Sequence, residues 1–174
     1  FGYVYTYSFC MRIIRSDQLS IQTDSPEQRE ALGNTLALYR AMVRDLMTVA
    51  LTHWPIVGVC VGNDAVKVIE GLIHPTSKRP KVRYRYFQKR YHKFPSYLRR
   101  VAIMDAVGQV RSYMTRYSAW LDGERRRPGE RPPAMTVATN TFPSLYAGQC
   151  IRLNEAATQA FIKVRYRNDW IWMG

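Results

Sequence analysis

The sequence predicts an α+β fold in which a helical module is inserted into a β-domain. Aromatic and apolar residues alternate with polar residues over positions 1–13, the two-residue period of a strand with one buried face. Residues 26–121 carry instead two long apolar stripes with helical spacing. The two-residue period returns after residue 133, so the first strand lies far in sequence from the strands it is expected to join.

The first long helix is predicted to begin at residues 24–26. Asp24 or Ser25 can cap it, Pro26 suits the first helical turn, and Glu27 lies where the helix dipole favours an acid. Its apolar residues are spaced alternately four and three apart: Leu32, Leu36, Tyr39, Val43, Leu46 and Ala50. Pro55 should end it, because proline restricts the residue before it.

Two more helices are expected. Asn63 or Asp64 can cap a brief one that ends at residues 74–75, and Pro95 and Ser96 open a second long one that should pack against the first. Its stripe consists of Ile103, Val107, Val110, Met114, Tyr117 and Leu121. The charged, proline-rich residues 122–133 should then form a solvated linker. Strands are expected over residues 135–139, 149–153 and 160–167, where the two-residue period resumes.

The charge predicts a polyanionic partner. The 174 residues contain 26 Lys and Arg but only 13 Asp and Glu, a formal net charge of +13. Such a field attracts nucleic acid before contact. No stretch approaches the ~20 apolar residues that cross a bilayer, so no membrane partner is expected. The three cysteines, Cys10, Cys60 and Cys150, are scattered, which favours buried thiols in a reducing cytoplasm.

The candidate interface is the basic segment, residues 78–100, which contains no acidic residue. Its cations are Lys78, Arg79, Lys81, Arg83, Arg85, Lys89, Arg90, Lys93, Arg99 and Arg100. Aromatic residues are interleaved with them: Tyr84, Tyr86, Phe87, Tyr91, Phe94 and Tyr97. Cations bind phosphates, and stacking on a ring is worth about 1–3 kcal/mol per base. The combination favours RNA or single strands, with Tyr97 among the expected contact residues.

Other interpretations of the segment stay open. Its aromatic residues, Tyr86, Phe87 and Phe94 above all, could be core residues, and its cations could be no more than a solvated face. A second basic cluster, Arg125, Arg126 and Arg127 with Arg131 nearby, lies in the linker and is a further candidate for phosphate contact.

Neither catalytic nor metal-binding residues are predicted in this chain. His53 and His74 accompany helix-ending prolines and His92 lies in the basic segment, so no pair of histidines has metal-ligand spacing on one helix. The sequence also lacks a P-loop, a nucleophile elbow and a glycine-rich dinucleotide turn.

Two motifs resemble the TnpB proteins, transposon-encoded RNA-guided nucleases related to type V CRISPR effectors. The first is Lys-Phe-Pro-Ser-Tyr-Leu-Arg-Arg at residues 93–100, which opens the second long helix. The second is Thr-Phe-Pro-Ser-Leu-Tyr at residues 141–146, preceded by Pro132-Pro133 and followed by the strand-like residues 163–170. The resemblance covers roughly the second half of the chain.

The resemblance implies a wedge β-barrel interrupted by a helical recognition lobe. Residues 1–24 would supply the first barrel strand, residues 25–131 the lobe and residues 132–174 the remaining strands. The implied partners are a guide RNA and double-stranded target DNA, held by backbone and shape while base pairing reads the sequence. By position, Arg40 and Arg44 could face the DNA. Cleavage in that family requires a RuvC-like nuclease domain with Mg2+, which residues 1–174 do not supply.

Two alternatives keep the RNA but change the function. The chain could come from a nuclease-dead relative that acts as an RNA-guided transcriptional repressor, or it could be a stand-alone structural RNA-binding protein. It begins at Phe1 rather than at methionine and ends at Met173-Gly174, straight after an aromatic strand, which suggests a fragment or a partly resolved chain. A second copy or a further chain could also be a partner.

Overall fold

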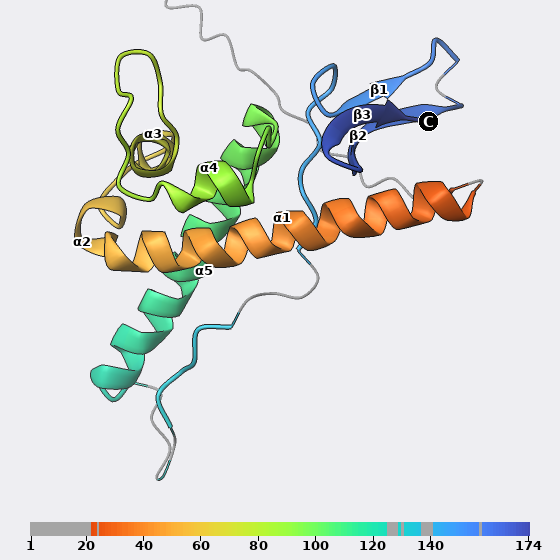
Figure 1. The fold of residues 1–174 in the computed structure, drawn as a ribbon. Coiled ribbons are helices and arrows are strands. Elements are labelled where there is room, and N and C mark those ends of the chain that lie inside the picture. The colour runs from red at the N-terminus through yellow and green to blue at the C-terminus, as the bar shows by residue number, and fades with distance from the viewer. Residues whose placement is uncertain (1–21, 24, 125–128, 130, 137–140, 157) are drawn as a thin grey trace, which may run out of the picture.

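A computed structural model describes residues 22, 23, 25–124, 129, 131–136, 141–156 and 158–174. These residues form a mixed α+β fold, as predicted (Figure 1). The helices are α1 (Pro26–Thr52), α2 (Trp54–Val57), α3 (Asp64–Ile73), α4 (Tyr86–Arg90) and α5 (Ser96–Leu121). The strands are β1 (Ile151–Leu153), β2 (Ala160–Tyr166) and β3 (Asp169–Met173).

Helix α1 begins at a complete capping box. The Ser25 hydroxyl accepts a hydrogen bond from the backbone N–H of Gln28 at 3.2 Å, and the Gln28 side chain accepts one from the N–H of Ser25 at 3.1 Å. Pro26 occupies the first turn, as expected, whereas Asp24 lies outside the described residues. The helix ends at Thr52, and Pro55 lies in the first turn of the short α2.

The core lies where α1 crosses α5, which confirms that the two long helices pack together (Figure 1). Tyr39, Val43 and Leu46 of α1 and Ile103 and Val110 of α5 are fully buried there. The predicted stripe of α5 is too long, however. Its buried residues end at Val110 and Leu121 is 58% exposed, because the second half of α5 extends away from α1 after the crossing.

The three strands form an antiparallel sheet in the order β1-β2-β3, which packs on the first half of α1. Ile162 and Val164 of β2 are buried with Ala31 of α1. The N–H of Arg165 donates to the hydroxyl of the buried Thr35 at 2.8 Å, tying strand to helix. Among the described residues this sheet is open and does not close into a barrel.

Three strand predictions need correction or lie outside the described residues. Met135 and Thr136 are not in a strand, and the rest of residues 135–139, like the predicted strand over residues 1–13, lies outside the described residues. The expected strand over 149–153 is shortened to β1, because residues 148–150 form a turn. The strand predicted over 160–167 is β2, and Arg167 adopts a φ of 53° in the turn that leads to β3.

Of the described helices, none combines the length and apolarity that a bilayer crossing requires. Cys150 is buried, as expected, whereas Cys60 is only half-buried; both are free thiols, and Cys10 lies outside the described residues.

The helix crossing predicts that substitution of two neighbouring residues of α5 lowers stability by very different amounts. Ile103→Ala should lower the free energy of unfolding by about 2–5 kcal/mol, because the side chain is fully buried and its loss leaves a cavity. Met104→Ala is the matched control: its side chain is 50% exposed, so its change should stay within about 0.5 kcal/mol. Urea denaturation followed by circular dichroism measures both, and equal losses would contradict the assigned crossing.

Candidate nucleic-acid interface

The basic segment is held to the core by its own aromatic rings. Phe87, Tyr91 and Phe94 are buried against α1, α3 and α5. Ring centroids lie 5.5 Å apart between Phe87 and Tyr91, 6.1 Å between Tyr91 and Phe94, and 5.2 Å between Phe94 and Trp170 of β3. The core interpretation is therefore correct for these three residues. It is wrong for Tyr86, which is 47% exposed.

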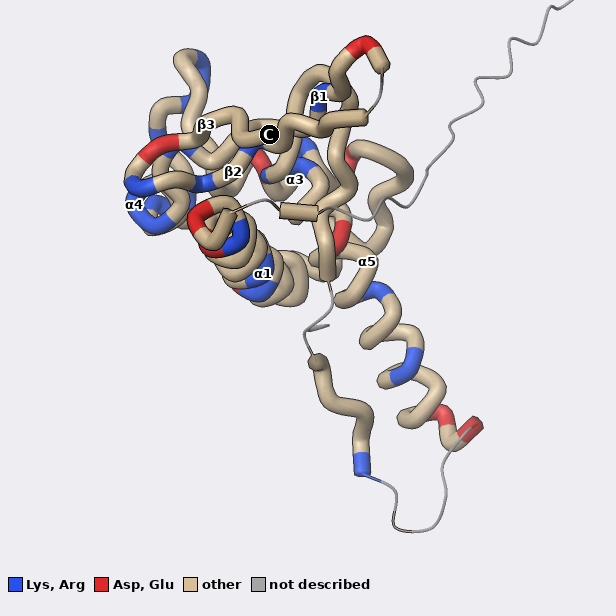
Figure 2. Tube along the Cα trace, turned by 90° about the vertical axis from the view of Figure 1, so that its right-hand side faces the viewer, with Lys and Arg blue, Asp and Glu red and all other residues tan. Residues whose placement is uncertain are grey.

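Most cations of the segment are exposed, whereas these rings are buried. Because the buried rings recur every three or four residues, the cations between Phe87 and Phe94 fall at exposed positions. Figure 2 shows Lys and Arg positions gathered around α4. The exposed members are Lys78, Arg79, Lys81, Arg83, Arg85, Lys89, Arg90, Lys93 and Arg100.

Carboxylates from other elements pair with part of this charge. Asp45 of α1 lies 3.5 Å from Arg90, and Asp169 of β3 lies 3.4 Å from Lys93. The backbone N–H of Trp170 and the Lys93 ammonium hold the pKa of Asp169 below its usual value. No acid lies within the segment itself, so these pairs could not be predicted from the sequence.

Glu70 of α3 pairs with the end of the segment. It lies 3.2 Å from Arg99 and 3.5 Å from Arg100. The Arg99 side chain is only 11% exposed, so it serves mainly to join α5 to α3. Tyr97 is half-buried, with its ring 5.7 Å from that of Tyr146. Of the predicted contact residues that the structure describes, Arg99 and Tyr97 are thus the least exposed to a phosphate backbone.

Within the described part of the chain, five exposed cations of the basic segment make neither a salt bridge nor a side-chain hydrogen bond. These unpaired cations are Lys78, Lys81, Arg83, Arg85 and Lys89. They follow one another along the loop between α3 and α4 and along α4 itself. Arg79 differs from them, since its guanidinium lies 3.4 Å from the carbonyls of both Glu70 and His74. The unpaired cations are the strongest phosphate-binding candidates, because binding need not break an existing ion pair.

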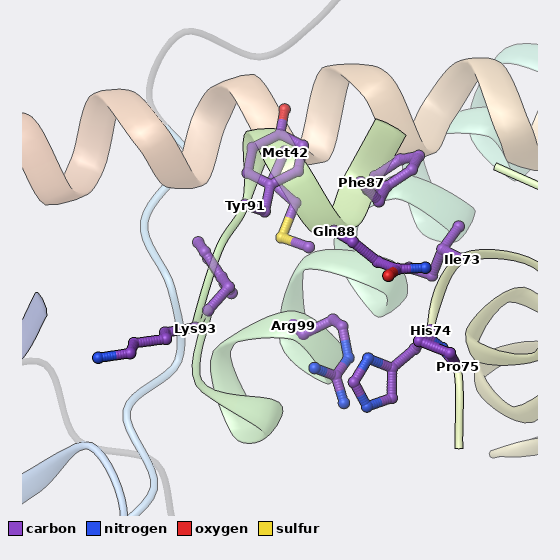
Figure 3. Close-up of a pocket in the computed structure, with 10 residues that line it drawn as sticks. Met42, Ile73, His74, Pro75, Phe87, Gln88, Tyr91, Lys93 and Arg99 are labelled. Carbon is purple, nitrogen blue, oxygen red and sulfur yellow. The ribbon is translucent and has the colours of Figure 1, made fainter. Parts of the chain in front are cut away.

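A pocket of about 170 Å3 opens between the basic segment, α1 and the end of α3 (Figure 3). Its lining residues come from α1, α3, α4, α5 and the connecting loops: Met42, Ile73, His74, Pro75, Phe87, Gln88, Tyr91, Lys93, Phe94 and Arg99. The close-up shows Gln88 pointing toward the centre and the Lys93 ammonium pointing away. His74 and Arg99 lie side by side at one edge. The sequence did not predict this pocket, whose lining spans residues 42–99.

Burial lowers the pKa of His74, and the positive charges of Arg99 and Arg79 lower it further. The ring is consequently neutral at pH 7, with one nitrogen as a donor and the other as an acceptor.

The other predicted binding residues are less well defined. Arg125, Arg126 and Arg127 lie outside the described residues. Arg131 lines a hollow of about 420 Å3 beside the end of α5, together with Arg116 and Trp120. Arg40 contacts a later part of the same chain. Its Nε donates to the carbonyl of Thr141 at 3.1 Å, and its guanidinium lies 5.1 Å from the centre of the Phe142 ring.

The described residues bring no three His, Cys, Asp or Glu side chains together as a metal site. His53 makes a hydrogen bond of 3.0 Å between its Nε2 and the hydroxyl of Tyr84, which ties the end of α1 to the last part of the loop before α4.

The Glu70 pairs predict a stability difference between two carboxylates of α3. Glu70→Gln should lower the free energy of unfolding by about 1–3 kcal/mol, because it leaves the poorly exposed Arg99 without its partner. Asp64→Asn removes an exposed pair with Lys67 and should cost less than about 1 kcal/mol. Guanidinium denaturation measures both variants; a smaller effect for Glu70→Gln would contradict its structural role.

The lowered pKa of His74 predicts a loss of stability in acid. Below the ordinary histidine pKa of 6.5 the unfolded chain takes up a proton more readily than the folded protein, so acid favours unfolding. Between pH 7 and pH 5 the wild type should therefore lose stability relative to His74→Gln, which cannot titrate there. Thermal unfolding across this range tests the expectation, and parallel curves for the two proteins would contradict it.

Comparison with known proteins places the chain in a family. No curated protein and no solved structure matches it. The model of the Aq_aa04 family matches residues 15–166, a span that includes all five helices, the basic segment, β1 and β2. Because this match covers most of the chain, the protein belongs to the Aq_aa04 family.

Proposed function

We propose that this protein binds the backbone of a nucleic acid through the unpaired cations. One observation carries the proposal: the segment that bears these cations is held to the core by its buried aromatic rings. The cations are Lys78, Lys81, Arg83, Arg85 and Lys89. Exposed cations that form no salt bridge among the described residues lose little on binding phosphates, and each neutralised phosphate releases counterions.

The surroundings of these cations favour RNA or single strands over duplex DNA. Helix α4 has only five residues, so it offers no long helix for a major groove. Tyr86 is exposed beside the cations, and Tyr84 is half-exposed. Such rings can stack on unpaired bases, which a duplex does not present.

The more specific form of the proposal is a guide-RNA and target-DNA binding portion of a TnpB-like RNA-guided nuclease. Supporting it, the two motifs that resemble that family meet in space, with Tyr97 of residues 93–100 against Tyr146 of residues 141–146 at 5.7 Å. The open sheet would then belong to a wedge barrel. Cleavage would need the RuvC-like domain and its Mg2+, so the repressor and the stand-alone RNA-binding protein remain alternatives.

Neutralising part of the cation cluster tests the phosphate contact. The triple variant Lys81→Gln, Arg85→Gln, Lys89→Gln should weaken binding to a single-stranded RNA. The slope of log affinity against log salt should become shallower by roughly 2 units, since about 0.7 is lost per phosphate contact on a single strand. Fluorescence anisotropy at several salt concentrations measures both quantities.

A matched triple variant controls for total charge. Lys67→Gln, Arg111→Gln, Arg116→Gln removes three exposed cations from α3 and α5, outside residues 78–100. It should change the salt slope by far less than the first variant. Equal losses for both would mean that only the general positive field attracts RNA, and no loss for the first would refute the interface.

The RNA that copurifies with the protein separates the alternatives. A single structured RNA species would support the RNA-guided forms, whereas bulk ribosomal RNA would support the stand-alone RNA-binding protein. Sequencing the bound RNA after nuclease trimming gives the answer.

A further inference from the structure

The pocket in the basic segment has an apolar floor and a polar rim. Met42, Ile73 and Phe87 form part of the floor and are at most 3% exposed. Gln88, His74 and Arg99 supply polar groups around it (Figure 3). A flat, apolar ring with polar edges is the kind of group that such a site accommodates.

The polar groups at the rim have unused hydrogen-bonding capacity. Within the described part of the chain, the side-chain amide of Gln88 and the ring of His74 make no hydrogen bond. Arg99 uses its Nε and one terminal nitrogen on Glu70, which leaves its other terminal nitrogen as a donor. The rim therefore offers a guanidinium donor, an amide and, at neutral pH, an imidazole donor and acceptor.

The pocket also lies beside the unpaired cations. Phe87 and Gln88 of α4 line it. In the sequence, Lys89 directly follows Gln88 and Arg85 lies two residues before Phe87. A backbone held by Arg85 and Lys89 would run past the opening, so a base turned out of its stack could reach the floor.

We propose that this pocket receives one unstacked nucleobase of the bound strand. Its volume of about 170 Å3 is below the ~300–1,000 Å3 of pockets for drug-sized ligands, so it suits a single ring system rather than a whole nucleotide. A base with ring carbonyls, such as uracil, offers acceptors to Arg99 and Gln88 and a ring N–H to His74. The inference rests on the proposed backbone binding and adds a specific contact to it.

Strands with and without a base test the pocket directly. One probe is an abasic sugar–phosphate strand of about ten units, within the usual site size, and the other is the same strand with a single uracil at its centre. Wild-type protein should bind the uracil strand about five- to 150-fold more tightly. In Gln88→Ala and in His74→Ala this ratio should fall toward one, while affinity for the abasic strand stays unchanged.

Lys89→Gln is the matched control, because it alters the residue next to Gln88 and leaves the pocket intact. It should weaken binding to both strands equally and preserve their ratio. A wild-type ratio of one, or a ratio that survives Gln88→Ala and His74→Ala, would overturn the base pocket. Failure of the abasic strand to bind, or insensitivity of its binding to Lys89→Gln, would instead overturn the proposed backbone binding.

Discussion

Burial of three aromatic rings from the basic segment is the interaction on which the rest of the candidate site depends. Phe87, Tyr91 and Phe94 sit against α1, α3 and α5, and burial of such a side chain is worth about 1.5–3 kcal/mol. A segment with so many positive charges would otherwise extend into solvent under its own repulsion. With the rings buried, the cations between them remain exposed, and a segment of like charges becomes a defined cationic surface.

Acidic residues from distant elements then divide this charge into two groups. Asp45, Glu70 and Asp169 pair with cations around the buried rings and at the start of α5, where the pairs join the segment to α1, α3 and β3. The unpaired cations, which lie in the loop between α3 and α4 and at Lys89, receive no such partner among the described residues. Part of the charge therefore stabilises the fold, and the rest is available to a polyanion without breaking an ion pair.

The crossing of α1 and α5 also creates a site that neither helix contains. Met42 of α1 and Arg99 of α5 face a common space, and α4 and the end of α3 close it with Gln88 and His74. The sheet supports this arrangement from the other side, since Trp170 packs on Phe94 and the Arg165 guanidinium donates to the carbonyl of His92. The proposed backbone surface and base pocket are in this sense products of one packing arrangement.

Local patterns in the sequence were sufficient for α1, α3, α5 and β2, because apolar spacing, prolines and, for α1, a capping residue act over a few positions. They also located the basic segment. They could not show that Phe87 and Phe94 are buried while Tyr86 is exposed, since all three look alike within a run of cations. Nor could they reveal that Glu70 neutralises Arg99 or that Met42 shares a pocket with Gln88. Those relationships join residues far apart in the chain, and only the packing of α1, α3 and α5 brings them within contact distance.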